Sequence, residues 1–375
     1  MSGLNPAIDP DGLLEFSVVF TDRSLNHMSQ AFQHVMRDIH ATLCEVYGAD
    51  RAVVIPGGGT YAMEAVARQF ATGKRAMVIR NGFFSYRWTQ IFEAGSIPAH
   101  ETVLKAQRVG EMNDDPFAPP PIRDVIAAIH RDKPDFIFAP HVETASGIIL
   151  PDDYIRRVAE AVHASGGMFV LDCIASGCAW VDMKELGVDV LLSAPQKGWS
   201  APPCAGLVMM NEAALELCKA NRSTSFAADL GKWNTIMEAY LGGGHAYHAT
   251  MPTDALRTFH AAMLETKAIG FEKLRKAQWQ QGDAVRRMLA ERGVQSVAAP
   301  GFGAPGVVVS FTTDPEIQNG KKFAAHGLQI AAGVPLMVDE GPDYRSFRLG
   351  LFGLDKLKDV PASLKRLERA FDEVF

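Results

Sequence analysis

The sequence predicts an α/β fold in which helices sandwich a mainly parallel sheet and a smaller α+β domain follows at the C-terminal end. Short apolar runs show continuous rather than alternating hydrophobicity, which is typical of strands buried on both faces. Amphipathic stretches separate these runs, as in repeated strand–helix–strand units. A length of 375 residues also exceeds the usual size of a single domain, which favours a large domain followed by a smaller one.

Strands and helices are expected to alternate along the first 210 residues. Pro151, followed by Asp152 and Asp153, is a typical helix start. The expected strands are 52–55, 76–79, 136–139, 168–171, 188–192 and 206–210, and the expected helices are 60–72, 122–131 and 152–164. Ligands of such sheets bind at the carboxyl ends of the strands, where the polar motifs of this chain also fall.

A proline-free stretch over residues 254–292 predicts long helices that join two domains. Further strands are expected at 306–311 and 346–350, with helices near 317–325 and 361–375. We therefore expect an N-terminal segment over 1–20, a large domain over 21–255 and a small domain over 256–375.

Charge and composition exclude several classes of protein. The net charge is −6 and no basic run of five or more occurs, so neither nucleic acid nor an anionic membrane is an expected partner. The N-terminal ten residues lack a secretory pattern, and no apolar stretch is long enough to span a bilayer, so we expect a cytoplasmic protein. Five cysteines without paired spacing predict reduced thiols, and His141, His245 and His248 lack the spacing of a metal site.

A glycine-rich turn, Pro56 to Thr60, follows one expected strand and opens a helix. Backbone N–H groups at a helix N-terminus favour an anion, so the turn fits a phosphate group. A tight turn without a ligand is the alternative. The spacing matches neither the dinucleotide fingerprint nor the P-loop, which disfavours a nucleotide.

Asp172 and Lys197 each follow a buried strand. A carboxylate at the end of a buried strand needs a positive partner, which for Asp172 could be a protonated pyridine nitrogen. The alternatives are that Asp172 caps the next turn or pairs with an arginine. Partial burial of Lys197 would lower its pKa and make its amine a better nucleophile, although most lysines are simply solvated. Together with the 56–60 turn, these are the parts that a single phosphate-bearing cofactor would need.

The chain resembles fold-type I pyridoxal-phosphate enzymes, and among them the class V aminotransferases of the alanine–glyoxylate and serine–pyruvate group. The blocks that carry the resemblance occur in the family's order. They are PGGGTYAMEA (56–65), NGFFSYRW (81–88), HVETASGIILP (141–151), LDCIAS (171–176), SAPQKG (193–198), YHATMP (247–252) and FRLG (347–350).

The resemblance implies a role for each matching residue. Lys197 would hold the cofactor covalently and move a proton between substrate Cα and cofactor C4′, while Asp172 would hold the pyridinium proton. The remaining cofactor contacts would be Gly58, Gly59, Thr60 and Gln196 at the phosphate, Phe84 stacked on the ring, and Thr144 near the ring hydroxyl.

Two further implications concern the substrate and a second subunit. Tyr247 and Thr250 match residues that reach the phosphate from the neighbouring subunit, which implies a homodimer with a shared active site; ordinary loop packing is the alternative. Arg348 matches the arginine that binds the substrate carboxylate, and its planar fork suits that group. An internal salt bridge is the rival role for Arg348.

The expected reaction moves an amino group from alanine, serine or aspartate to glyoxylate or pyruvate. The alternatives are a 2-aminoethylphosphonate–pyruvate transaminase and a lyase such as a cysteine desulfurase, although Gln196 stands where the lyases usually have histidine. A dehydrogenase is disfavoured because Arg80 and Asn81 occupy the place of its acidic residue. The N-terminal segment lacks the family's early Gly-Pro motif, and Arg23 there could supply an additional anion contact.

Overall fold

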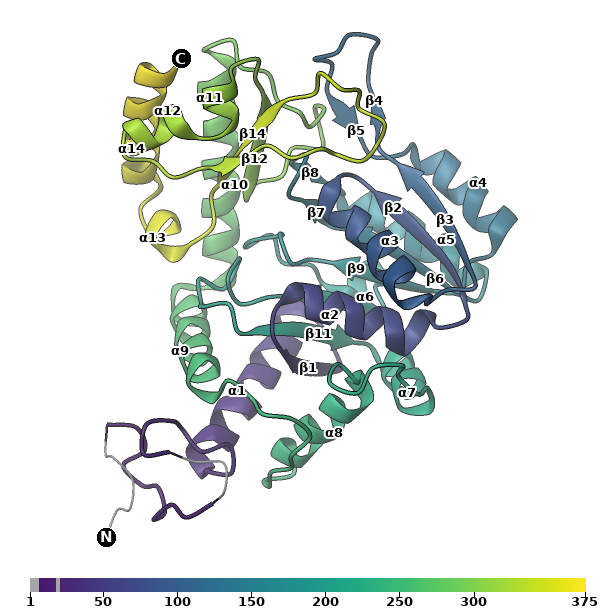
Figure 1. Ribbon diagram of the computed structural model, residues 1–375, viewed down its shortest axis with the longest axis vertical. Helices are drawn as coiled ribbons and strands as arrows, with labels where there is room; N and C mark the ends of the chain where they lie inside the picture. Colours follow the sequence, from purple (N-terminus) through teal and green to yellow (C-terminus); the bar gives the residue numbers. More distant parts are fainter. Residues whose placement is uncertain (1–6, 18–20) are drawn as a thin grey trace.

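A seven-stranded sheet forms the centre of the computed structural model, which describes residues 7–17 and 21–375 (Figure 1). The strand order is β1-β11-β10-β9-β6-β2-β3, and only the pairs made by β11 are antiparallel. The strands are β1 (Arg51–Pro56), β2 (Arg75–Arg80), β3 (His100–Lys105), β6 (Phe136–Pro140), β9 (Met168–Asp172), β10 (Val190–Ser193) and β11 (Ala205–Met210). The mainly parallel α/β fold expected from the sequence is thereby confirmed.

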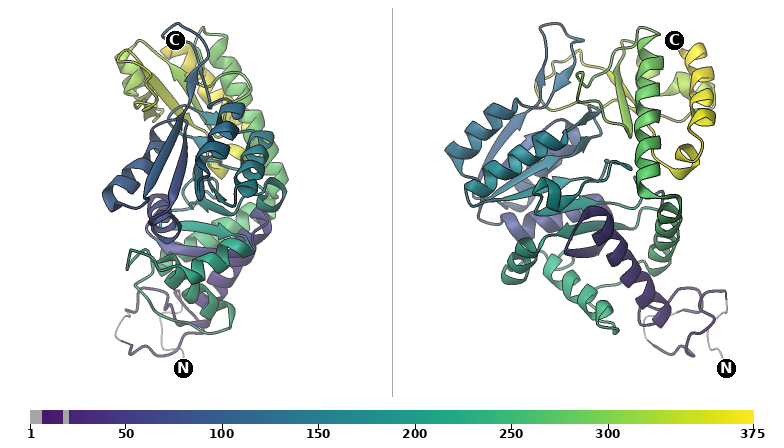
Figure 2. Two further views of the ribbon diagram at one scale, coloured as in Figure 1. Left: turned by 90° about the vertical axis from the view of Figure 1, so that its right-hand side faces the viewer. Right: turned by 180° about the vertical axis from the view of Figure 1, so that it is seen from behind.

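Helices cover both faces of this sheet. In Figures 1 and 2, α2 and α3 lie on one face, and α4 and α5 lie on the other. Their apolar sides pack on strands that are themselves buried, which accounts for the continuous apolar runs. The helices of this part are α1 (Gln30–Tyr47), α2 (Gly59–Val66), the π-helix η1 (Ala67–Ala71), α3 (Phe83–Gly95), α4 (Ile122–Asp132), α5 (Asp152–Ala164), α6 (Met183–Leu186), α7 (Glu212–Ala220) and α8 (Leu230–Leu241).

A second, antiparallel sheet follows, with the order β12 (Val307–Phe311), β14 (Ser346–Gly350) and β13 (Ala331–Ala332). Two long helices, α9 (Thr253–Ile269) and α10 (Phe271–Ala290), lead into it, and Gly270 separates them with a φ of 103°. The remaining helices are α11 (Pro315–Gln318), α12 (Lys321–Ala325), α13 (Leu354–Leu357) and α14 (Val360–Val374). Short hairpins are formed by β4 (Gln107–Arg108) with β5 (Phe117–Ala118) and by β7 (Val142–Glu143) with β8 (Ile148–Ile149).

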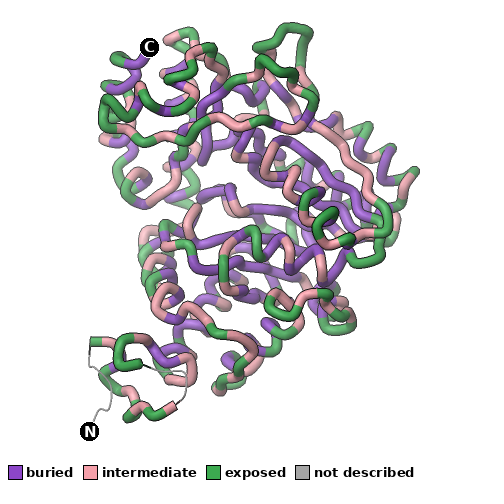
Figure 3. The backbone as a smooth tube through the Cα atoms, viewed as in Figure 1, coloured by how far each residue is buried: buried purple, intermediate pink, exposed green. Residues whose placement is uncertain are grey.

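Each sheet has its own buried residues. The largest apolar cluster surrounds the seven-stranded sheet, whereas a smaller one joins Val285, Phe347 and Phe371 beside the C-terminal sheet. Figure 3 shows the buried backbone concentrated along the strands. The expected boundary between residues 255 and 256 falls in the first turn of α9, and the division into domains stays a prediction. Residues 1–6 and 18–20 of the expected N-terminal segment lie outside the described residues.

Strand direction places the functional motifs at one edge of the large sheet. Strands β1, β2, β6, β9 and β10 all point the same way, so their carboxyl ends meet there. Asp172 lies level with Pro140 of β6 and Leu192 of β10 in the register of the sheet. Over residues 7–17 and 21–375, no helix has both the length and the apolar character needed to cross a membrane.

Candidate active site

A cavity of about 200 Å³ opens at the carboxyl ends of β6, β9 and β10, beside the first turns of α2 and α3. Residues from five separate blocks of sequence line it. The cavity brings together seven of the predicted site residues, which are Gly59, Thr60, Phe84, Thr144, Asp172, Gln196 and Lys197. Gly58 is the residue immediately before α2, next to the lining residues.

Asp172 is a buried carboxylate at the floor of this cavity. Its Oδ1 accepts a hydrogen bond from the Ile174 N–H at 2.9 Å. Burial raises the pKa of Asp172 from 3.8 to about 7; Glu143 also raises it, whereas the Ile174 hydrogen bond and the Arg87 charge lower it. A buried carboxylate so poorly compensated fits a protonated ring nitrogen as its partner.

Lys197 enters the cavity from the turn that follows β10. Burial lowers its pKa, and the nearby positive charges of Arg348 and Arg87 lower it further. Among the described residues, no carboxylate forms an ion pair with its Nζ atom, which lies 5.4 Å from the centroid of the Phe352 ring. The uncharged, nucleophilic amine is therefore more accessible than in a solvated lysine.

The turn that carries Lys197 is held in place by the two residues that follow the lysine. A Cβ atom at Gly198 would lie 2.3 Å from the Gly177 carbonyl oxygen, so only glycine permits this approach. Trp199 is fully buried and packs against Trp180, with the ring centroids 4.9 Å apart. The backbone beside the amine is thus rigidly positioned.

The glycine-rich turn ends β1 and begins α2. A Cβ atom at Gly59 would lie 2.5 Å from Cδ1 of Ile174, which brings the turn close to the end of β9. The Tyr61 and Ala62 N–H groups donate to the Gly58 carbonyl oxygen, so the Gly59 and Thr60 N–H groups are the ones at the start of α2 that can bind an anion. Gln196 has a buried Oε1 without a hydrogen-bond partner among the described residues, and rotation of its amide would offer the Nε2 donor to a phosphate.

Glu143 is a buried residue that sequence reasoning did not identify. Its Oε1 accepts from the Phe84 N–H at 3.2 Å, and its Oε2 accepts from the N–H and Oγ of Ser85 at 2.8 and 2.6 Å. Burial raises the pKa of Glu143, and these hydrogen bonds oppose that shift. The carboxylate therefore fixes the first turn of α3, from which Phe84 enters the cavity. Its position within the 141–151 block was the available signal.

Arg348 lies on β14 and approaches the cavity from the C-terminal sheet. Its Nε donates to the Ala332 carbonyl oxygen at 2.8 Å, and its guanidinium carbon lies 5.5 Å from the centroid of the Phe84 ring. No described carboxylate lies within ion-pair distance of it, so the internal salt bridge considered as a rival role is not observed. Burial lowers its pKa, as expected for a cation without a close partner.

Arg87 is the second residue that sequence reasoning missed. It lines the cavity from α3, and its Nη1 donates to Thr60 Oγ1 at 3.0 Å. The sequence offered a weak signal, because Arg87 stands three residues after Phe84 and helical spacing places both on one side of the helix.

Tyr247 and Thr250 do not line this cavity. They line a separate one of about 110 Å³ with His27 and Trp233, and their hydroxyl groups are 3.3 Å apart. Tyr247 is 60% exposed. Arg23 is almost wholly exposed, with Asp22 as its ion-pair partner. The role of Tyr247 and Thr250 at a neighbouring subunit's phosphate stays a prediction, as does the anion contact of Arg23.

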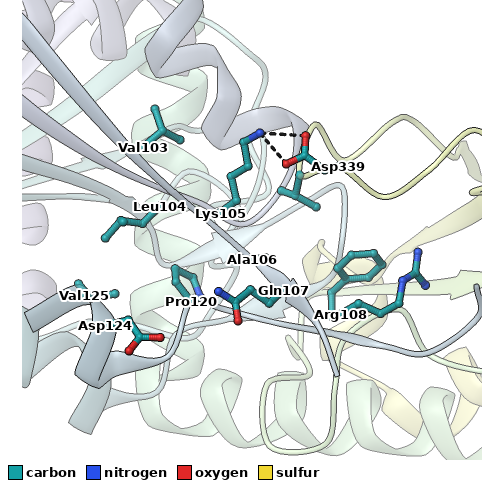
Figure 4. Close-up of a pocket in the computed structure, with 12 residues that line it drawn as sticks. Val103, Leu104, Lys105, Ala106, Gln107, Arg108, Pro120, Asp124, Val125 and Asp339 are labelled. Carbon is teal, nitrogen blue, oxygen red and sulfur yellow. Dashed lines mark hydrogen bonds and ion pairs between the residues drawn. The ribbon is translucent and has the colours of Figure 1, made fainter. Parts of the chain in front are cut away.

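A larger cavity, of about 470 Å³, lies at the outer edge of the sheet and contains none of the predicted residues. Figure 4 shows Lys105 paired there with Asp339, which belongs to the loop between β13 and β14. Arg108 donates to the Glu340 carbonyl oxygen of the same loop at 2.8 Å. These contacts fasten the loop that precedes Arg348 to the large sheet.

Comparisons with known proteins agree with the geometry of the site. The family described as aminotransferase class-V matches residues 15–315. Alanine–glyoxylate aminotransferase 1 from Saccharomyces cerevisiae is 25% identical over 351 residues, covering 88% of this chain and 86% of the relative. A 2-aminoethylphosphonate–pyruvate transaminase from Paraburkholderia phymatum is 28% identical over 349 residues, covering 90% and 88%.

A solved structure shows the same fold. Alanine–glyoxylate aminotransferase from Nostoc sp. superposes with a TM-score of 0.78 at 20% identity, covering 93% of this chain and 88% of that one. The family match spans most of the chain, and the site offers a buried carboxylate, a desolvated lysine and a helix N-terminus at suitable places. The chain belongs to the class-V aminotransferase family and is a transaminase whose cofactor is pyridoxal phosphate.

Proposed function

We propose that the enzyme transfers the amino group of a small amino acid, namely alanine, serine or aspartate, to glyoxylate or pyruvate. The observation that carries this proposal is that Lys197 and Asp172 line one cavity, while Arg348 lies over Phe84, another residue of its lining. The yeast relative, named an alanine–glyoxylate aminotransferase, supports the same choice.

The proposed mechanism assigns one task to each residue. Bound pyridoxal phosphate supplies an electron sink. Asp172 keeps a proton on the ring nitrogen, which preserves that property, and its raised pKa falls once a cation sits beside it. The Lys197 amine would hold the cofactor covalently and would act as the general base that takes the substrate Cα proton.

Substrate orientation is assigned to Arg348. Its guanidinium would bind the α-carboxylate through two parallel hydrogen bonds, holding Cα within reach of Lys197. Phe84 lies beneath this arginine and would support the cofactor ring by stacking, without offering it a hydrogen bond. The Glu143 carboxylate holds the backbone of Phe84 in position.

Transfer from 2-aminoethylphosphonate to pyruvate is the second candidate, because a relative with that name covers 90% of this chain. A cysteine desulfurase reaction is less well supported. No cysteine lines the cavity, and burial raises the pKa of Cys44 and Cys204 to about 11. A reactive thiolate, which such a lyase needs, is therefore disfavoured.

A half-reaction screen tests the proposal. The purified enzyme is mixed with one amino donor at a time, without an acceptor, and conversion of the bound cofactor is followed by its absorbance. We expect alanine, serine or aspartate to convert it and Lys197→Ala to abolish the conversion. Conversion by 2-aminoethylphosphonate alone would replace the proposal with the second candidate, and release of sulfide from cysteine would indicate the lyase.

A further inference from the structure

Arg87 lines the catalytic cavity without an acidic partner. Its Nη1 donates to Thr60 Oγ1 at 3.0 Å, and its guanidinium carbon lies 4.9 Å from the centroid of the Phe84 ring. Among the ion pairs of the described residues, Arg87 takes part in none. A guanidinium group placed in a cavity without a carboxylate is well suited to an anionic ligand.

The position of Arg87 indicates which part of the ligand it would meet. Thr60 is the second residue of α2, and the N–H groups of Gly59 and Thr60 have no acceptor among the described residues, so they can bind an anion. The hydrogen bond to Thr60 therefore places the guanidinium beside the glycine-rich turn. Backbone dipole and side-chain charge then act on the same anion.

A second cation near the cavity makes the assignment more specific. Arg348 also lacks a carboxylate partner, but it comes from β14 of the C-terminal sheet and donates to Ala332 instead of the turn. Two unpaired arginines in different places match a ligand pair with two anionic groups, the cofactor phosphate and the substrate carboxylate. Of these two arginines, only Arg87 forms a hydrogen bond with the glycine-rich turn.

We propose that Arg87 binds the phosphate group of pyridoxal phosphate, together with the first turn of α2. The phosphate carries close to two negative charges at neutral pH, and the bidentate fork of arginine matches its oxygen atoms. This proposal rests on the assigned cofactor and is independent of which amino donor the enzyme uses.

The test compares two probes that differ only in the phosphate group. Affinities of the cofactor-free enzyme for pyridoxal phosphate and for unphosphorylated pyridoxal are measured for the wild type, Arg87→Ala and Arg87→Lys. Arg87→Ala should weaken pyridoxal phosphate binding by about 10- to 100-fold more than pyridoxal binding, because the charge-assisted phosphate contact is lost only for the phosphorylated probe. The affinity of Arg87→Lys for pyridoxal phosphate should lie between those of the wild type and Arg87→Ala, since lysine keeps the charge and loses the planar fork.

Arg348→Ala serves as the matched control, because it removes the other unpaired arginine and should leave the ratio of the two affinities unchanged. Circular dichroism and thermal unfolding of each cofactor-free variant establish that it is folded, and Arg87→Gln provides a second neutral replacement. Equal losses for the two probes would overturn the proposal and assign Arg87 to holding Phe84. Unchanged affinities with a raised KM for aspartate or 2-aminoethylphosphonate would assign it instead to a second anionic group of the substrate.

Failure of the donor screen would leave this experiment interpretable. Binding is measured without any amino donor, so an unsuccessful search for the donor does not alter the two affinities. Conversely, loss of the phosphate contact leaves the reaction class intact.

Discussion

At the scale of single residues, the site depends on a charge that the protein itself leaves poorly compensated. Burial of Asp172 raises its pKa from 3.8 to about 7, so the cofactor-free protein favours the protonated acid. A group whose pKa is higher in the folded state binds protons there more tightly than in the unfolded chain. Its ionisation therefore costs stability as the pH rises from about 4 to about 7.

Asp172→Asn should relieve this cost in the cofactor-free enzyme. At about pH 8 the variant should be more stable than the wild type by a few kcal/mol, the order of magnitude that such a shift implies, and the difference should shrink toward about pH 4. Urea unfolding of both cofactor-free proteins at the two pH values measures it. A variant that is no more stable at the higher pH would contradict the inferred ionisation. With pyridoxal phosphate present, the order should reverse, since the asparagine cannot hold a pyridinium cation.

Sequence reasoning identified the residues that stand within a recognisable local sequence pattern. Asp172 and Lys197 follow apolar runs, and Gly59 stands in a glycine-rich turn, so local patterns were sufficient. Glu143 and Arg87 were missed because their partners are remote in the chain. The bonds from Ser85 and Phe84 to Glu143 span more than 50 residues, and no local pattern predicts such contacts. The roles assigned to the site residues stay predictions until the variants are measured.

At the scale of secondary structure, the turn after β10 depends on close packing against residues 177–180. Gly198 lies against the backbone of Gly177, while Trp199 is buried with Trp180, so the two residues that follow Lys197 have little freedom. A shift of the backbone in this turn would displace the Lys197 amine.

Gly198→Ala should therefore impair both stability and cofactor binding. Its Cβ would lie 2.3 Å from the Gly177 carbonyl oxygen, and a contact with backbone cannot be relieved by rotation of a side chain. We expect a loss of about 1–3 kcal/mol in the free energy of unfolding and weaker binding of pyridoxal phosphate. Gly350→Ala is the control, since the nearest atom to its Cβ lies 3.8 Å away. Equal stability of the two variants would show that the turn can relax.

The expected strands and helices agree with the structure where burial on both faces leaves a continuous apolar pattern. The edge strand β3 was not among them, because it is only partly buried and contains His100, Glu101 and Lys105. The helix expected near 317–325 is divided into α11 and α12, which Gly320 separates with a φ of 83°. Edges and breaks are set by neighbouring elements, and single-sequence periodicity does not record them.

At the scale of the whole molecule, the two sheets are joined by long helices and by a fastened loop. Lys105 and Arg108 hold the loop before β14, so the strand carrying Arg348 is tied to the large sheet at its edge. Elsewhere the surface exposes aromatic side chains. Phe226 is 81% exposed and Tyr247 is 60% exposed, and both line an open hollow of about 1070 Å³. Exposed aromatic groups gathered around a hollow favour contact with another protein surface.

We predict that the enzyme is a homodimer whose contact surface includes Tyr247. Sedimentation should give twice the 40.8 kDa mass of the chain. Tyr247→Ala should loosen the dimer and release pyridoxal phosphate more readily, as expected if this residue reaches the neighbouring site. Met112→Ala, at another residue that is 65% exposed, should change neither property. A monomer that retains its cofactor on dilution would contradict the prediction.

The reversed strand β11 has a consequence for the length of the ligand. It lies between β1, whose end forms the glycine-rich turn, and β10, which leads to Lys197. Neighbouring strands are spaced by about 4.8 Å, so the two ends stand roughly 10 Å apart. The spacing of the strands therefore sets the length of the ligand. A molecule that contacts the carboxyl ends of both β1 and β10 must span this gap together with the side chain of Lys197.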